Sequence, residues 1–117
     1  MLRPMTVPAD NLLRGLPADA ADELFTTLAA RGGARVERIV STGQASPDGF
    51  WYDQAWDELV LLVQGAAGLR FAAEAAERRL GPGDWVLIPA GARHRVDWTQ
   101  AEPPTVWLAV HFPPDGP

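Results

Sequence analysis

The chain of 117 residues contains no cysteine. A disulfide framework, a thiolate metal site and a cysteine nucleophile are therefore excluded, and we expect a protein of the reducing cytoplasm. Lysine is absent as well, so all ten basic residues are arginines, and they are scattered along the chain. With a net charge of −5 and no basic stripe, the chain is not expected to bind nucleic acid.

Long apolar runs are also missing. No segment approaches the roughly 18 apolar residues of a membrane-spanning helix, so no membrane partner is expected. Pro4, Pro8 and Asp10 interrupt the N-terminal segment, which argues against a signal peptide. Glycine and proline, by contrast, are abundant, with eleven of each. They predict short strands joined by tight turns, and hence an all-β sandwich or barrel.

The first 33 residues are predicted to form an arm and one short helix that packs on the barrel. Pro17 suits the first turn of a helix over residues 17–31, and the Gly32-Gly33 pair would end it. Three acidic residues suit the N-terminal end of this helix, namely Asp19, Asp22 and Glu23. An apolar stripe follows the helical period and consists of Ala20, Leu24 and Leu28. Residues 34–117 are predicted to form the barrel.

The most informative stretch is residues 83–98, which reads as strand, turn and strand. Pro89 and Gly91 punctuate it, and the three residues His94, Val96 and Trp98 then alternate with polar neighbours. Alternation with a period of two predicts that these three side chains share the inward face of a strand. His94 would then present a ring nitrogen to an interior cavity, with Val96 and Trp98 as its walls.

This stretch resembles the second signature of the cupin superfamily, G-x5-P-x-G-x2-H-x3-N. Gly83, Pro89, Gly91 and His94 stand at the matching positions, whereas Trp98 replaces the usual Asn. The resemblance implies a double-stranded β-helix, or jelly-roll barrel.

The first cupin signature, G-x5-H-x-H-x3,4-E-x6-G, is matched only in its second half, by Glu58 and Gly65. With the shorter spacer, its two histidine positions hold Tyr52 and Gln54. With the longer spacer they hold Trp51 and Asp53. We prefer the shorter register, which would direct Gln54 and Glu58 toward His94. If the register slips by one residue, Asp57 replaces Glu58.

The resemblance implies a metal site and a class of reaction. Gln54, Glu58 and His94 offer an amide oxygen, a carboxylate and an imidazole, which together could hold a divalent ion such as Mn, Fe or Zn. Cupins with such an ion include dioxygenases and isomerases of small oxygenated molecules. His111, in the last predicted strand, is either partly exposed or lines the cavity, where it could serve as a wall residue or a fourth ligand.

Two metal-free alternatives stay open at this stage. In the first, His94 and Tyr52 form an acid–base pair, as in some sugar-nucleotide epimerases of the superfamily, and Glu58 orients the imidazole. In the second, the barrel is a non-catalytic module that binds a small ligand. A homodimer is expected in every case, because a chain of this size buries only a modest core.

Overall fold

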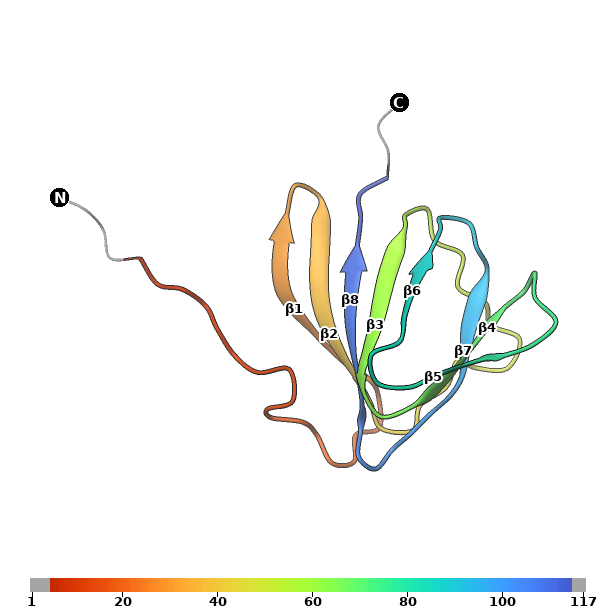
Figure 1. Ribbon diagram of the computed structural model, residues 1–117, viewed down its shortest axis with the longest axis horizontal. Coiled ribbons are helices and arrows are strands. Elements are labelled where there is room, and N and C mark those ends of the chain that lie inside the picture. Colours follow the sequence, from red (N-terminus) through yellow and green to blue (C-terminus); the bar gives the residue numbers. More distant parts are fainter. Residues whose placement is uncertain (1–4, 115–117) are drawn as a thin grey trace.

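The computed structural model describes residues 5–114 and shows an all-β protein (Figure 1). Its eight strands are β1 (Leu24–Arg31), β2 (Ala34–Ser41), β3 (Glu58–Gln64), β4 (Ala67–Phe71), β5 (Arg78–Leu80), β6 (Trp85–Ile88), β7 (His94–Thr99) and β8 (Thr105–His111). They form a five-stranded sheet in the order β1-β2-β8-β3-β6 and a three-stranded sheet in the order β5-β4-β7, and every pairing is antiparallel. No residue from 5 to 114 lies in a helix able to cross a membrane.

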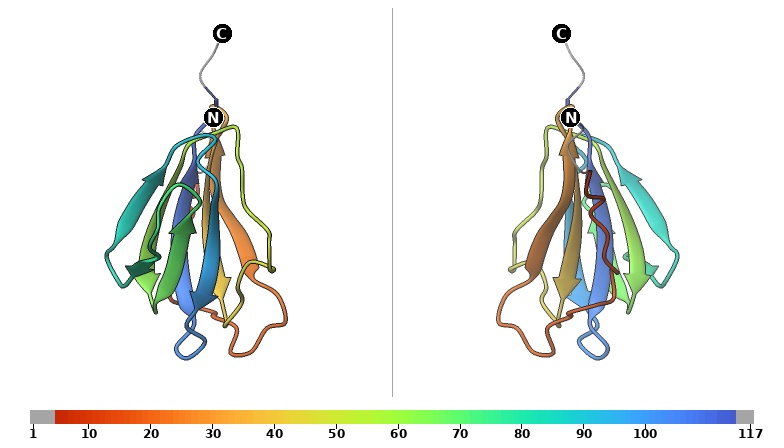
Figure 2. Two further views of the ribbon diagram at one scale, coloured as in Figure 1. Left: turned by 90° about the vertical axis from the view of Figure 1, so that its right-hand side faces the viewer. Right: turned by 90° about the vertical axis from the view of Figure 1, so that its left-hand side faces the viewer.

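The two sheets face one another and enclose the core (Figure 2). In β3 and β8 alternate side chains point inward, and Val60, Leu62, Trp107 and Ala109 are each at most 6% exposed. Leu69 packs with them from the opposite sheet. This alternation is the pattern expected of antiparallel sheets that cover one face.

The helix predicted for residues 17–31 is wrong, because Leu24–Arg31 forms strand β1. Gly32 and Gly33 have φ angles of 57° and 82° and form the two-residue turn of a hairpin, in which Arg31 pairs with Ala34. A pair of glycines with positive φ is the preferred sequence for such a turn. The same pair is also typical of a helix end, whereas Phe25, Thr26 and Thr27 favour a strand.

The expected position of Trp98 is also corrected by the structure. Gly68 and Leu69 are consecutive in β4, yet they pair with Trp98 and Val96 of β7. The additional residue, Asp97, forms a β-bulge, which reverses the alternation beyond it. Val96 therefore keeps the inward orientation, whereas the Trp98 indole packs over Gly68 and beside the Arg79 guanidinium.

Candidate functional site

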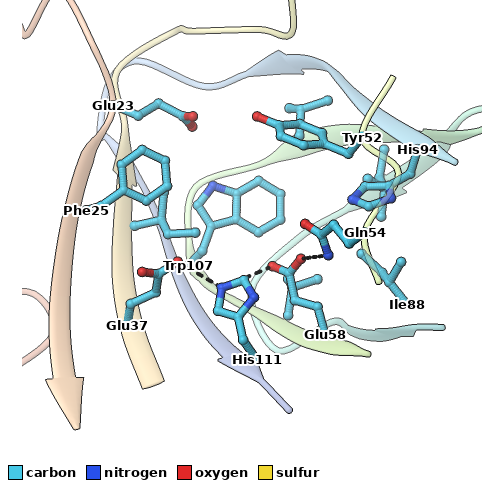
Figure 3. A pocket seen from close by; sticks show the side chains of 14 residues that line it. Glu23, Phe25, Glu37, Tyr52, Gln54, Glu58, Ile88, His94, Trp107 and His111 are labelled. Carbon is cyan, nitrogen blue, oxygen red and sulfur yellow. Dashed lines mark hydrogen bonds and ion pairs between the residues drawn. The ribbon is translucent and has the colours of Figure 1, made fainter. Parts of the chain in front are cut away.

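The site is a cavity of about 120 Å³ between the two sheets. Four of the residues singled out from the cupin signatures line it together, namely Tyr52, Gln54, Glu58 and His94 (Figure 3). The remaining wall consists of Glu23, Phe25, Glu37, Ile39, Val60, Leu69, Ile88, Val96, Trp107 and His111.

His94 begins β7 and is held in one tautomer by its backbone surroundings. Its main chain forms an isolated bridge with Tyr52, through hydrogen bonds of 2.7 and 3.1 Å. The ring Nδ1 lies 2.9 Å from the carbonyl oxygen of Ala92. A carbonyl only accepts hydrogen bonds, so Nδ1 carries the proton and the Nε2 atom of neutral His94 has a free lone pair. His94 is only 5% exposed.

Glu58, the first residue of β3, brings a carboxylate into the cavity. It is 7% exposed. The amide nitrogen of Gln54 donates a hydrogen bond of 3.0 Å to its Oε1, and the backbone carbonyl of Gln54 accepts one of 2.7 Å from Gly91. Thus the Pro-Gly turn fixes Gln54, and Gln54 in turn orients Glu58. The neighbouring Asp57 instead accepts a hydrogen bond from the backbone of Ala90 and is not part of the cavity wall.

The second histidine, His111 at the end of β8, is held in the opposite tautomer. Its Nδ1 accepts a hydrogen bond of 2.9 Å from the indole N–H of Trp56, a group that only donates. Nδ1 is therefore unprotonated, and Nε2–H of the neutral ring donates to Glu37 at 2.9 Å. The second carboxylate near Nε2, that of Glu58, lies 4.0 Å away. His94 thus presents an acceptor to the cavity, whereas His111 keeps a donor engaged with Glu37.

Tyr52 stacks on the His94 ring, with a centroid distance of 5.4 Å and an interplanar angle of 23°. Burial, followed by the negative charges of Glu23 and Glu58, raises the pKa of the Tyr52 phenol above its ordinary value. Tyr52 therefore remains protonated at neutral pH and can donate a hydrogen bond. The two rings lie on the same side of the cavity, so they are poorly placed to act on opposite faces of one carbon atom.

Within residues 5–114, His94 Nε2 and Glu58 Oε2 have no hydrogen-bond partner, and neither do Tyr52 Oη, Gln54 Oε1 and Glu23 Oε1. Among the described residues, Arg38 Nε is the one side-chain polar atom that is both unpaired and sealed from solvent. The free lone pairs of His94 and Glu58 are therefore open to the cavity. A buried polar atom that accepts nothing from the protein is a natural position for a ligand.

Of the predicted wall residues, Val96 and His111 line the cavity, whereas Trp98 does not. The sequence reasoning missed Glu23 and Phe25 because both were assigned to the helix. It also missed Glu37. The alternation of β2 did give a signal for this residue, since Glu37 lies on the same strand face as the inward-pointing Ile39. A carboxylate in phase with an apolar face is a mark of a site, because burying an unpaired charge is costly.

Comparison with known proteins places this barrel in a family. Neither a family profile nor a curated protein matches the chain. Among solved structures, a Ralstonia eutropha protein provisionally named a mannose-6-phosphate isomerase is 50% identical, with a TM-score of 0.89 over 92% of this chain and 99% of that one. The chain belongs to the cupin superfamily.

Two more distant structures share the fold of this cupin. A cupin superfamily protein from Desulfitobacterium hafniense is 19% identical, with a TM-score of 0.70 over 96% of this chain and 99% of that one. An RmlC-like cupin from Desulfovibrio desulfuricans is 14% identical, with a TM-score of 0.72 over 94% and 100%.

The resemblance to cupins implies a metal ion among the cavity residues, so their donors can be tested for fit. Within residues 5–114, no three His, Cys, Asp or Glu side chains form a metal-binding group. This cupin does offer one imidazole and one carboxylate with open lone pairs, beside the Gln54 amide. The hydrogen bond from His94 Nδ1 to a carbonyl is the usual support of a metal-ligating histidine. The donor chemistry therefore fits a divalent ion with open coordination positions.

Proposed function

We propose that this cupin binds one divalent metal ion through His94 Nε2, Glu58 and Gln54, and acts there on a small oxygenated molecule. The observation that carries the proposal is the pair of unpartnered lone pairs on His94 and Glu58, in side chains that are 5% and 7% exposed. Mn, Fe and Zn all accept such nitrogen and oxygen ligands. When bound, the ion would supply Lewis acidity to an oxygen of the molecule, as in dioxygenase- or isomerase-like cupins.

The chain's own residues have distinct tasks in this proposal. Ala92 and Gln54 hold the ligating side chains by the hydrogen bonds already described. Tyr52, kept protonated by its raised pKa, donates a hydrogen bond to the bound molecule. Trp107 and Phe25 supply apolar walls that limit the access of water. Trp56 keeps His111 as a donor to Glu37, so His111 is not used as a ligand.

The test is the metal content of untagged protein after growth with added Mn, Fe or Zn. The wild-type chain should retain a nearly stoichiometric amount of one ion, and re-addition after chelation should raise the melting temperature. An ion at about 100 times its dissociation constant stabilises the folded state by about 2.7 kcal/mol. Glu58→Gln and His94→Gln, which preserve side-chain size, should each abolish most of this gain.

Asp57→Asn is the matched control for Glu58→Gln. Asp57 is adjacent in sequence, yet it bonds the backbone of Ala90, which an asparagine oxygen can still do. The control should keep the metal content and the thermal shift of the wild type. A wild-type protein that retains no ion, or a control that loses as much metal as Glu58→Gln, would overturn the proposal.

A metal-free reaction with His94 as general base is the second candidate. It is favoured by the free Nε2 lone pair, and Tyr52 lines the same cavity as the sequence reasoning required. The stacked arrangement of the two rings and the raised Tyr52 pKa make Tyr52 a weak partner acid. Ligand binding without turnover in metal-free protein would instead favour the non-catalytic module.

A further inference from the structure

The wall of the cavity is negatively charged. A second cavity of about 300 Å³ adjoins the first, because Glu23, Phe25, Tyr52 and Val96 line both. Its charged residues are Asp22 and Glu23, while the inner cavity adds Glu37 and Glu58. Neither wall contains an arginine, although the described part of the chain holds nine of the ten arginines.

Only some of this charge is compensated inside the protein. Glu37 has Arg35 at 3.4 Å and the Nε2–H group of His111 at 2.9 Å. Glu23, by contrast, accepts a hydrogen bond from the Ser41 hydroxyl and has no ion-pair partner within residues 5–114. Figure 3 shows its carboxylate across the cavity from Gln54 and Glu58, with the Trp107 indole between them. A cationic ligand group near Glu23 would offset this charge.

The free polar atoms of the inner cavity lead to the same conclusion independently of the charge. His94 is only 5% exposed, and its unpartnered Nε2 atom offers a lone pair rather than a hydrogen atom. Glu58 Oε2 likewise only accepts. Whatever occupies this part of the cavity, the proposed ion or a group of the ligand, must therefore offer positive charge or hydrogen-bond donors to these two atoms.

The aromatic residues at the junction of the two cavities fit a cation as well. Phe25 and Tyr52 line both cavities, and they are 55% and 36% exposed. Aromatic faces attract ammonium groups through the quadrupole of the ring. A carboxylate flanked by two exposed aromatic rings is a suitable environment for a protonated amine.

We propose that the molecule bound by this cupin is a small amino compound, whose ammonium group lies between Glu23 and the rings of Phe25 and Tyr52. This rests on the proposed function, because the oxygenated end of the same molecule would point to Glu58 and His94. A phosphate ester is disfavoured, since it carries between one and two negative charges at neutral pH and would meet Asp22 and Glu23 without a guanidinium. The name of the Ralstonia relative therefore does not indicate the substrate of this chain.

The test compares three probes by calorimetry: 1-amino-2-propanol, the neutral 1,2-propanediol, and mannose 6-phosphate. The amine should bind at least about tenfold more tightly than the diol, which corresponds to about 1.4 kcal/mol. Mannose 6-phosphate should bind more weakly than either. Glu23→Gln keeps the hydrogen bond from Ser41 but removes the charge, so it should reduce the affinity for the amine to that for the diol.

Asp19→Asn is the control, because Asp19 is exposed in the same segment and lines neither cavity. It should leave the preference for the amine unchanged, and unaltered diol binding will show that Glu23→Gln is folded. Equal affinities for amine and diol in the wild type, or a preference that survives Glu23→Gln, would refute the proposal. Metal content is measured on the same samples. A wild-type protein with normal metal content but no preference for the amine refutes only the ligand class. A wild-type protein that prefers the amine but holds no metal refutes only the metal site.

Discussion

Replacing Trp56 with phenylalanine tests how His111 of this cupin is held. The substitution removes the indole N–H that donates to His111 Nδ1 at 2.9 Å. His111 is 9% exposed, so little water can replace the lost donor. An unsatisfied buried acceptor costs about 1 to 3 kcal/mol, and we expect the free energy of unfolding to fall by that amount.

Urea-induced unfolding followed by circular dichroism measures the change, and Trp85→Phe provides the matched control. Trp85 is 65% exposed, so the same substitution there should change stability by less than about 0.5 kcal/mol. If the two variants lose the same stability, the hydrogen bond from Trp56 contributes nothing and the reasoning about His111 fails.

The tautomers themselves are accessible to nitrogen NMR, because the chain has only two histidines. At a pH where both rings are neutral, metal-free protein should give one ring protonated at Nδ1, assigned to His94, and one protonated at Nε2, assigned to His111. Two rings in the same tautomer would contradict the donor and acceptor assignment of the site.

Three further predictions follow from the fold and the site. Tyr52 is the one tyrosine of the chain, so phenolate absorbance reports it alone; in metal-free protein its pKa should lie above the ordinary value of 10.0. Because the pKa of Tyr52 is higher in the folded than in the unfolded chain, the stability contributed by its neutral phenol is complete below the unfolded-state pKa and is lost as pH rises through the folded-state pKa. Tyr52→Phe should remove this pH dependence of the free energy of unfolding in alkaline denaturation experiments. Gly65→Ala should destabilise the fold by more than about 2 kcal/mol, because φ is 91° and a Cβ would lie 2.8 Å from Thr105 Cα, whereas Gly49→Ala, with φ of 75° and open space around it, should cost less in the same assay. The expected homodimer is checked by light scattering: Leu28→Glu on the edge strand β1, where Leu28 is 48% exposed, should yield a monomer, and an unchanged mass would exclude this edge from the interface.

Much of the barrel could be read from the sequence, because alternation and turn residues are local signals. The strand, turn and strand predicted over residues 83–98 correspond to β6, the turn that contains Pro89 and Gly91, and β7. The N-terminal strand was predicted as a helix because its apolar residues recur at every fourth position. All eight residues of β1 are exposed, so the sequence shows no alternation of buried and exposed residues that would indicate a strand. Only its pairing with β2 distinguishes the two interpretations.

The site was partly accessible for a similar reason. Pro89 and Gly91 mark the turn that positions His94, so the sequence signal for His94 lies within five residues of it. Glu23 and Glu37 reach the cavity through the pairing of strands that are distant in the sequence, and Trp56 meets His111 across 55 positions. No local pattern encodes such contacts, and they decide the charge of the wall and the tautomers.

The bulge at Asp97 sets how much room a ligand has. The Nε atoms of Arg70 and Arg95 form ion pairs with the Asp97 carboxylate at 2.7 and 2.8 Å, and these pairs hold the additional residue in place. If β7 kept this residue but ran as a regular strand, the alternation would continue from Val96 to Trp98 and turn the bulky Trp98 indole from the outer surface toward the interior. The bulge therefore separates an open chamber from a plugged one, and a related chain with a regular strand here would need a smaller side chain at position 98 to leave the same room.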